Sequence, residues 1–243
     1  MINNKTFLAI IPARGGSKRI PGKNLIELNG KPLIQWTIDA TKQCDLIDEI
    51  VVSSDDEEIL ELAGSAGCRA LTRPADLSED LSSRASVIRH AVEVMAEQGR
   101  TCDYLIYLQP TSPLRNAKEI ERAIRFLHHR QADAVISVCE LDHPLQWSGT
   151  LPEDRNMQNF LDNIDVQTRS QDLEKYYRLN GAIYICDIKS FLEEGCVFLR
   201  ENVYAFVMDR KDSVDIDHYE DLLVAKAFMD YKASKPAGDY RGS

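Results

Sequence analysis

Short apolar runs separated by polar segments predict a regular alternation of strands and helices along this chain. Runs of this kind are typical of buried strands, and they occupy residues 7–11, 49–53, 68–72, 103–109, 134–138, 180–187 and 204–208. Between them, apolar residues recur at helical spacing. The helices predicted in this way begin near residue 32, after residues 55–56 and near residue 87, and two more span 117–128 and 218–231.

This alternation predicts an α/β fold in which a Rossmann-like, mostly parallel sheet carries helices on both faces. In a sheet of this kind, ligands bind beyond the carboxyl ends of the strands. The loops that follow residues 11 and 109 leave strands at that edge. We therefore expect these two loops to form the functional site.

Residues 139–176 interrupt the alternation, because they are polar, acidic and irregular and contain Pro144, Trp147 and Pro152. We interpret them as an inserted segment, either a substrate lid or an arm exchanged with another subunit. Their composition is equally consistent with a plain surface excursion. Residues 1–138 and 177–234 are then expected to form the α/β domain, and the tail at 235–243 is expected to be disordered.

The composition narrows the class of protein. With 243 residues, 44% of them hydrophobic, the chain can bury the core of one large domain. Its longest early apolar run, residues 7–11, is too short for a signal-peptide core or a membrane span. We therefore expect a cytoplasmic protein with no membrane partner. The six cysteines form no C-x-x-C pair, which leaves zinc and redox motifs without support.

The formal net charge of −10 argues against nucleic acid as the main partner, but one loop has the opposite sign. Arg14, Lys18, Arg19 and Lys23 follow the first strand with no acidic residue among them, on a loop that also holds three glycines. Glycine lets backbone N–H groups approach closely, and the cations neutralise phosphate oxygens, so this loop suits a polyphosphate. The competing interpretation is a solvated basic loop. The spacing matches neither the common ATP-binding loop nor the dinucleotide fingerprint.

Two later segments also carry candidate chemistry. Residues 109–115 follow the strongest predicted strand, and two prolines would hold their polar side chains in place. A rigid turn without a ligand is the alternative. Asp215 and Asp217 lie two residues apart, so in extended backbone both point to one side and could bind one Mg²⁺ ion. The alternative is that Asp217 caps the last helix.

These segments resemble the signature motifs of the acylneuraminate cytidylyltransferase family, whose members make CMP-sialic acids and other CMP-nonulosonic acids. Five motifs between residues 9 and 217 carry the resemblance. They are Ala13-Arg14 and Ser17-Lys18 followed by Lys23-Asn24, Arg73-Pro74 with Leu77, LQPTSPLR at 108–115, Tyr177-Arg178 with Asn180-Gly181-Ala182, and Ser213-Val214-Asp215-Ile216-Asp217.

The resemblance implies a fold of the nucleotide-diphospho-sugar transferase type and a nucleotidyltransferase reaction. In that reaction, CTP and a nine-carbon 2-keto sugar acid of the N-acylneuraminate type would give a CMP-sugar and pyrophosphate. The resemblance also implies Mg²⁺ as cofactor and a homodimer in which residues 140–176 form the contact arm.

The same resemblance assigns roles to individual residues. Arg14, Lys18, Lys23 and Asp217 are expected to be catalytic, and Asp215 and Asp217 to bind the metal. Ala13, Asn24, Arg73 and Ser83 are expected at the nucleotide. Gln109, Arg169, Arg178 and Asn180 are expected at the sugar acid, where Arg169 suits the carboxylate.

Two departures from the family pattern leave the sugar undetermined. Gln146 and Trp147 stand where some members have a lysine, and Arg84 interrupts a stretch that is usually small and polar in sialic-acid members. Legionaminate and pseudaminate therefore remain alternative substrates. Two further alternatives are a nucleotidyltransferase for another nucleotide or sugar phosphate, and a non-catalytic module that binds nucleotide sugars.

Overall fold

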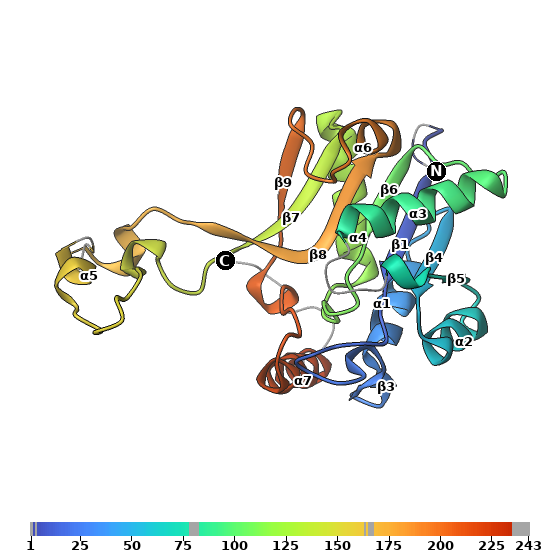
Figure 1. Ribbon diagram of the computed structural model, residues 1–243. Helices are drawn as coiled ribbons and strands as arrows, with labels where there is room; N and C mark the ends of the chain where they lie inside the picture. The colour runs from blue at the N-terminus through green and yellow to red at the C-terminus, as the bar shows by residue number, and fades with distance from the viewer. Residues whose placement is uncertain (1, 3, 78–82, 163, 165–167, 235–243) are drawn as a thin grey trace.

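A seven-stranded sheet forms the centre of the protein (Figure 1). The computed structural model describes residues 2, 4–77, 83–162, 164 and 168–234. All the predicted strands are present, and their spatial order is β5-β4-β1-β6-β8-β7-β9. Their bounds are β1 (Phe7–Pro12), β4 (Glu49–Ser54), β5 (Arg69–Thr72), β6 (Tyr104–Tyr107), β7 (Ala134–Glu140), β8 (Tyr177–Asp187) and β9 (Val203–Val207).

The sheet is mostly parallel, as predicted, with β8 as the exception. β1 pairs in parallel with β4 and β6, β4 with β5, and β7 with β9, whereas β8 runs antiparallel to both β6 and β7. The sequence did not predict this reversal. A parallel neighbour requires a crossover over a face of the sheet, whereas the chain leaves β7 and returns into β8 at the same edge. The first half of β8 therefore lies at the carboxyl edge of the parallel strands.

Helices cover both faces of the sheet, as predicted (Figure 1). Residues 7, 9 and 11 of β1 point into one apolar core and residues 8 and 10 into the other, because successive strand residues face opposite ways. The first core is closed by α1 (Leu33–Lys42), α2 (Glu57–Ser65) and α4 (Ala117–Arg130), and the second by α3 (Arg84–Glu97) and α6 (Ile188–Glu194).

The strand order creates a crevice beside β1. The chain runs outward from β1 through β4 to β5, and then returns to the other side of β1 as β6. The loops that follow β1 and β6 therefore diverge at the carboxyl edge of the sheet. Ligands of open α/β sheets bind at such a reversal of strand order.

A third apolar cluster joins the basic loop to the last helix, α7 (Tyr219–Ser234). Ile20 of the loop packs with Ile216, and Ala225 contributes from α7. Leu28 belongs to a short hairpin that the sequence did not predict, formed by β2 (Glu27–Leu28) and β3 (Lys31–Pro32). None of the helices in the described part of the chain is long and apolar enough to cross a bilayer.

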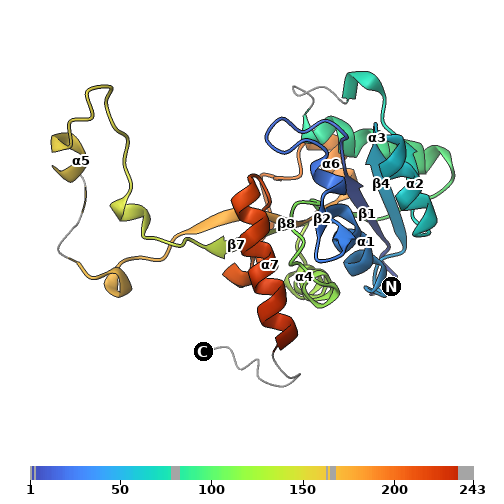
Figure 2. The same ribbon diagram turned by 90° about the horizontal axis from the view of Figure 1, so that it is seen from below.

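The segment between β7 and β8 projects from the body as an arm (Figures 1 and 2). We use this name for the described residues between 141 and 176. The arm leaves the ribbon of β7 and β8 beyond their last pair, Glu140 and Tyr177. Its regular elements are short, namely η3 (Leu145–Trp147), α5 (Gln158–Asp162) and η4 (Ser170–Asp172). The predicted disordered tail, 235–243, lies outside the described residues.

Arg115 fastens the loop after β6 to its surroundings. Its side chain is 1% exposed and donates to the carbonyl oxygen of Ala182 at 2.9 Å and to Thr37 Oγ1 at 2.6 Å. Burial lowers the pKa of Arg115 to about 9, because the interior disfavours its charge. The guanidinium thus links β8 and α1 to the loop that begins at Gln109, to whose carbonyl it also donates.

Replacing Arg115 by methionine is expected to lower the free energy of unfolding by about 3 kcal/mol, because buried acceptors would lose their donor. Urea denaturation followed by circular dichroism measures this loss. Arg125→Met removes an exposed guanidinium from α4 and is the matched control, with an expected change below about 0.5 kcal/mol. Equal losses in the two variants would show that Arg115 does not hold the loop.

Candidate active site

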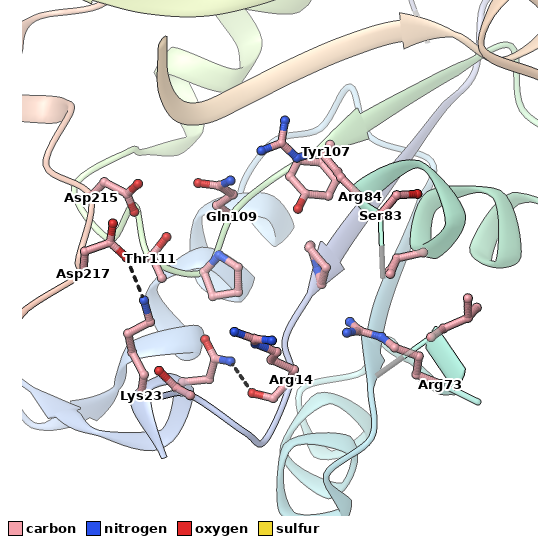
Figure 3. A pocket seen from close by; sticks show the side chains of 16 residues that line it. Arg14, Lys23, Arg73, Ser83, Arg84, Tyr107, Gln109, Thr111, Asp215 and Asp217 are labelled. Atoms are coloured by element: carbon pink, nitrogen blue, oxygen red, sulfur yellow. Dashed lines mark hydrogen bonds and ion pairs between the residues drawn. The ribbon is translucent and has the colours of Figure 1, made fainter. Parts of the chain in front are cut away.

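A cavity of about 470 Å³ opens at the carboxyl edge of the sheet (Figure 3). It lies between the loops after β1 and β6, the start of α3 and the segment that precedes α7. This is the position predicted from the strand order. Its lining residues are Pro12, Arg14, Ser17, Lys23, Asn24, Arg73, Leu77, Ser83, Arg84, Val87, Tyr107, Gln109, Pro110, Thr111, Asp215 and Asp217.

Two glycines allow the basic loop to take its shape. Gly22 has φ of 63°, a left-handed conformation that glycine adopts without steric cost, and it precedes η1 (Lys23–Leu25). A Cβ at Gly15 would lie 2.6 Å from Asp56 Oδ2, so a larger residue here would displace the side chain that caps α2. Asn24 then holds the loop from within, since its Nδ2 donates to the carbonyl oxygen of Arg14 at 2.8 Å.

Lys23 connects this loop to the two aspartates. Its ammonium donates to the carbonyl oxygen of Ile216 at 2.7 Å and lies 3.3 Å from Asp217 Oδ1. Arg19 approaches the same carboxylate oxygen at 2.7 Å. Although burial opposes them, the two cations lower the pKa of Asp217, which keeps this carboxylate ionised.

Asp217 does not cap α7 with its side chain. The backbone amides of Asp217 and His218 both donate to Asp221 Oδ2, at 2.8 and 2.7 Å. The acceptor for these amides at the start of the helix therefore comes from inside the helix. The carboxylate of Asp217 is left to face Lys23 and the cavity (Figure 3).

Asp215 is the more buried of the two carboxylates. Burial raises the pKa of Asp215, and the nearby charge of Asp217 adds to the shift, while a hydrogen bond to Thr111 and the charge of Lys23 oppose it. Its Oδ1 atom is buried and has no hydrogen-bond partner. A buried acceptor without a donor is costly, so Asp215 suits a cation that would occupy this position.

The pair could hold a cation only with help from other ligands. No group of three or more His, Cys, Asp or Glu residues in the described ranges is arranged to bind a metal ion. Mg²⁺ commonly takes one or two carboxylates and completes its shell with phosphate oxygens and water. The donor set of Asp215 and Asp217 fits that ion if a phosphate lies in the cavity.

Cations gather at the other end of the cavity, below Gln109 in Figure 3. Arg73 is 6% exposed and donates to Ser53 through Nε and Nη2, at 3.3 and 2.8 Å. Burial lowers the pKa of Arg73 and the neighbouring Arg14 lowers it further, while Asp55 opposes both. Two like charges in one part of a cavity favour a bound anion.

The structure brings eight of the predicted site residues to the cavity lining, namely Arg14, Lys23, Asn24, Arg73, Ser83, Gln109, Asp215 and Asp217. Five others lie outside the lining. Ala13 is buried behind it, where its amide donates to the carbonyl oxygen of Ser53. Lys18 is exposed on the basic loop, Arg169 is exposed on the arm, and Arg178 lies on β8 near the carbonyl of Ser213.

Asn180 is the predicted sugar contact whose surroundings differ most from expectation. It is 1% exposed, and its Oδ1 accepts from Ser137 Oγ at 2.6 Å while its Nδ2 donates to Ser213 Oγ at 2.9 Å. These bonds join β7, β8 and the segment that leads to Asp215. The structure therefore gives Asn180 a positioning role, because its polar atoms are already bonded inside the protein.

Tyr107, Thr111 and Arg84 are among the lining residues that the sequence did not indicate as site residues. Tyr107 ends β6, Thr111 lies in the loop after it, and Arg84 begins α3. The available signal was that Tyr107 lies near the end of the strongest strand and that Thr111 lies in the loop directly after it. Arg84 stood out only as a departure from the family pattern.

Comparison with known proteins identifies relatives over almost the whole chain. A family model described as "Cytidylyltransferase" matches residues 8–234. The pseudaminic acid cytidylyltransferase of Campylobacter jejuni subsp. jejuni serotype O:2 is 39% identical over 220 residues, which cover 90% of this chain and 94% of that protein. The CMP-N,N'-diacetyllegionaminic acid synthase of Legionella pneumophila is 33% identical over 234 residues, which cover 92% and 96%.

Two further comparisons bear on length and fold. The N-acylneuraminate cytidylyltransferase of Escherichia coli O18:K1:H7 is 32% identical over 220 residues, which cover 90% of this chain but 51% of that protein. The solved CMP:2-keto-3-deoxy-manno-octonic acid synthetase complexed with CTP has a TM-score of 0.67 at 18% identity, covering 93% of this chain and 99% of that one. These matches confirm the family resemblance and the fold that the motifs predicted.

Replacing Asp215 by asparagine is expected to stabilise the protein in EDTA at pH 7.5. The pKa of Asp215 is raised in the folded state, so the folded protein binds a proton more tightly than the unfolded chain does. The favourable contribution of Asp215 to stability is complete below the pKa that it has in the unfolded chain. That contribution is lost as the pH rises through the pKa that it has in the folded protein. Asparagine, which carries no charge, would avoid that loss, and urea midpoints measured from pH 7.5 downward test this.

The gain in midpoint should shrink as the pH falls toward the pKa of an unfolded aspartate, about 3.9. Asp230→Asn removes an exposed carboxylate from α7 and is the control, with no gain expected at any pH. A lower midpoint for Asp215→Asn at pH 7.5 would refute the account of Asp215 as a destabilising buried charge.

Proposed function

This chain belongs to the cytidylyltransferase family, and we propose that it transfers the CMP group of CTP to a nine-carbon 2-keto sugar acid with release of pyrophosphate. The observation that carries the proposal is that Lys23 joins a cationic loop to a pair of carboxylates inside one cavity. A polyphosphate would bind to the cations of the loop, and a divalent cation would bind to the two carboxylates. The cavity could therefore hold both.

The reaction requires alignment and charge neutralisation more than covalent chemistry from the protein. The C2 hydroxyl of the sugar acid in its ring form attacks the α-phosphorus of CTP. A new O–P bond forms, the hydroxyl proton is released to solvent, and the bond between the α-phosphorus and the β-phosphate oxygen breaks. Arg14 and Lys23 would neutralise the charge that develops on the leaving pyrophosphate. Holding both substrates in one cavity lowers the barrier by orienting nucleophile and leaving group before reaction.

Asp215 and Asp217 are the residues that would hold Mg²⁺. When bound, that ion lowers the pKa of a coordinated hydroxyl and neutralises phosphate oxygens. The fit rests on the buried, unpartnered Oδ1 of Asp215 and on the ionised carboxylate of Asp217. Lys23 would hold the two aspartates in position relative to the phosphates, since its ammonium contacts the backbone carbonyl between Asp215 and Asp217.

Pseudaminate is the sugar acid that we favour. The sequence motifs alone pointed first to an N-acylneuraminate, with legionaminate and pseudaminate as alternatives. Identity is 39% to the pseudaminic acid enzyme, against 32% and 33% to the N-acylneuraminate and legionaminic acid enzymes. This difference supports pseudaminate, although all three acids share the reacting 2-keto acid group.

Pyrophosphate release by the purified protein with CTP and Mg²⁺ tests the proposal. Pseudaminate, legionaminate and N-acetylneuraminate are compared with 3-deoxy-manno-octulosonate, and each is repeated with ATP, GTP and UTP. We expect release with CTP and the strongest signal with pseudaminate. Binding of CTP without release from any acid would favour the non-catalytic module, and release with another nucleotide would favour a different nucleotidyltransferase.

Lys23→Ala and Asp217→Ala are each expected to lower kcat/KM by at least about a hundredfold, because each removes a charge next to the reacting phosphates. The assay is steady-state pyrophosphate release with the preferred acid. Lys226→Ala, which removes an exposed ammonium from α7, is the matched control and should retain full activity. Normal turnover by Lys23→Ala or Asp217→Ala would remove that residue from the mechanism.

We also propose that the arm packs against a second copy of this chain. It exposes large apolar side chains without covering them, namely Leu145, Trp147, Leu151, Met157 and Leu161. Such a concentration on a projecting segment is typical of a surface that is buried in an assembly. Arg169 lies on this arm, so it would reach a sugar acid only in the cavity of the second copy.

Replacing both Trp147 and Leu151 by glutamate is expected to convert a dimer of the 27.5 kDa chain into a monomer, because charges would replace buried apolar contacts. Analytical ultracentrifugation of the two proteins at equal concentration measures the change. Leu223→Glu alters an apolar residue of α7 that is 69% exposed, and it should leave the dimer intact. A monomeric unmodified protein would contradict the proposed assembly.

A further inference from the structure

Arg84 occupies an unusual position in the cavity. It is the first residue of α3, directly after Ser83, whose side chain caps the helix by accepting from the amide of Ser86. Its guanidinium lies over three aromatic rings, at 5.3 Å from the centroids of Tyr107 and Tyr184 and at 5.6 Å from that of Phe198. Stacking of this kind fixes the plane of a guanidinium and leaves its N–H edge to bind a ligand.

The charge of Arg84 has no acidic partner in the described part of the chain. None of the described ion pairs includes Arg84, whereas Lys23 contacts Asp217. Arg73, another arginine of the cavity lining, is bonded to Ser53 at the end where cations gather. An arginine that lines a cavity without a carboxylate partner favours an anionic ligand, and a carboxylate matches its forked donors best.

Arg84 and the predicted sugar contact Gln109 both lie next to the side chain of Tyr107. Burial raises the pKa of the Tyr107 hydroxyl, and both Arg84 and Gln109 oppose this shift by hydrogen bonding. Figure 3 shows Arg84, Tyr107 and Gln109 along the same wall of the cavity, which continues to Asp215. Thr111, two residues after Gln109, lines the cavity with Asp215 and lowers the pKa of its carboxylate. This wall therefore runs from Arg84 to the carboxylates at the reacting centre.

We propose that Arg84 binds the carboxylate of the sugar acid and thereby selects 2-keto acids over neutral sugars. The carboxylate is attached to C2, the carbon whose hydroxyl attacks, so it would lie on the wall between Arg84 and the carboxylates of Asp215 and Asp217. Arg169, which the sequence suggested for this role, lies on the arm and outside the cavity lining of its own chain. This inference rests on the proposed function and specifies how the same site recognises its acceptor.

Steady-state kinetics of Arg84→Gln test the assignment. Glutamine keeps hydrogen-bonding capacity but removes the charge, so KM for the sugar acid should rise roughly 30- to 100-fold while KM for CTP changes less than about threefold. Arg89→Gln is the matched control, since Arg89 lies on the same helix and over the ring of Phe191, outside the cavity. Its KM values should match those of the unmodified protein. Thermal unfolding of both variants shows whether they remain folded.

A neutral analogue identifies the group that Arg84 contacts. The methyl ester of the preferred acid is used as a competitive inhibitor, alongside a non-reactive acid with the same ring. The unmodified protein should bind the acid at least about tenfold more tightly than the ester, and Arg84→Gln should bind the two equally. Retained preference for the acid in Arg84→Gln, or a KM increase in Arg169→Gln alone, would overturn the assignment.

Failure of this inference can be separated from failure of the proposed function. If the unmodified protein releases no pyrophosphate with any nine-carbon acid, the proposed function fails before Arg84 is tested. If the unmodified protein is active and Arg84→Gln has an unchanged KM for the acid, only the role of Arg84 fails.

Discussion

The contact between the Lys23 ammonium and the 216–217 segment is the interaction on which the candidate site depends. Lys23 stands at the end of the basic loop, and the segment that it touches is separated from it by almost the whole length of the chain. One donor therefore brings the cations and the carboxylates into the same cavity. The apolar cluster of Ile20, Ile216 and Ala225 supports this contact from beneath, so that burial of apolar surface holds two charged segments together.

The reversed strand β8 provides the second constraint. Because it runs against its neighbours, its first half reaches the carboxyl edge, where Asn180 bonds to Ser213 just ahead of Asp215. Arg115 similarly fastens the loop that carries Gln109 and Thr111 to β8. These buried polar groups form bonds within the protein, and they place other side chains in the cavity. Asn180 and Arg115 position the site because they are buried, whereas the side chains that they place in the cavity line it.

The site also contains charged groups whose burial is unfavourable for folding, in a chain of net charge −10. Asp215 is held in surroundings that raise its pKa, and Arg73 in surroundings that lower its pKa. Both shifts oppose the charged form, so neither residue is optimal for stability in isolation. A bound nucleotide with a divalent cation would supply the opposite charges that each group requires. Stability and function are therefore in tension at the same residues.

The sequence by itself determined the seven strands of the central sheet, the helices α1 to α4 and α7, and the mostly parallel α/β class, because apolar periodicity reflects which faces are buried. It also selected Arg14, Lys23, Asp215 and Asp217, all of which line the cavity, since glycine-rich cationic loops and paired carboxylates carry their chemistry in local spacing. Only the tertiary structure decided that β8 is reversed, that Asn180 is buried, that Asp221 and not Asp217 accepts from the amides at the start of α7, and that Arg84 stacks on aromatic rings from three distant segments. These outcomes depend on contacts between residues far apart in the chain, and local pattern contains no information about which of them meet.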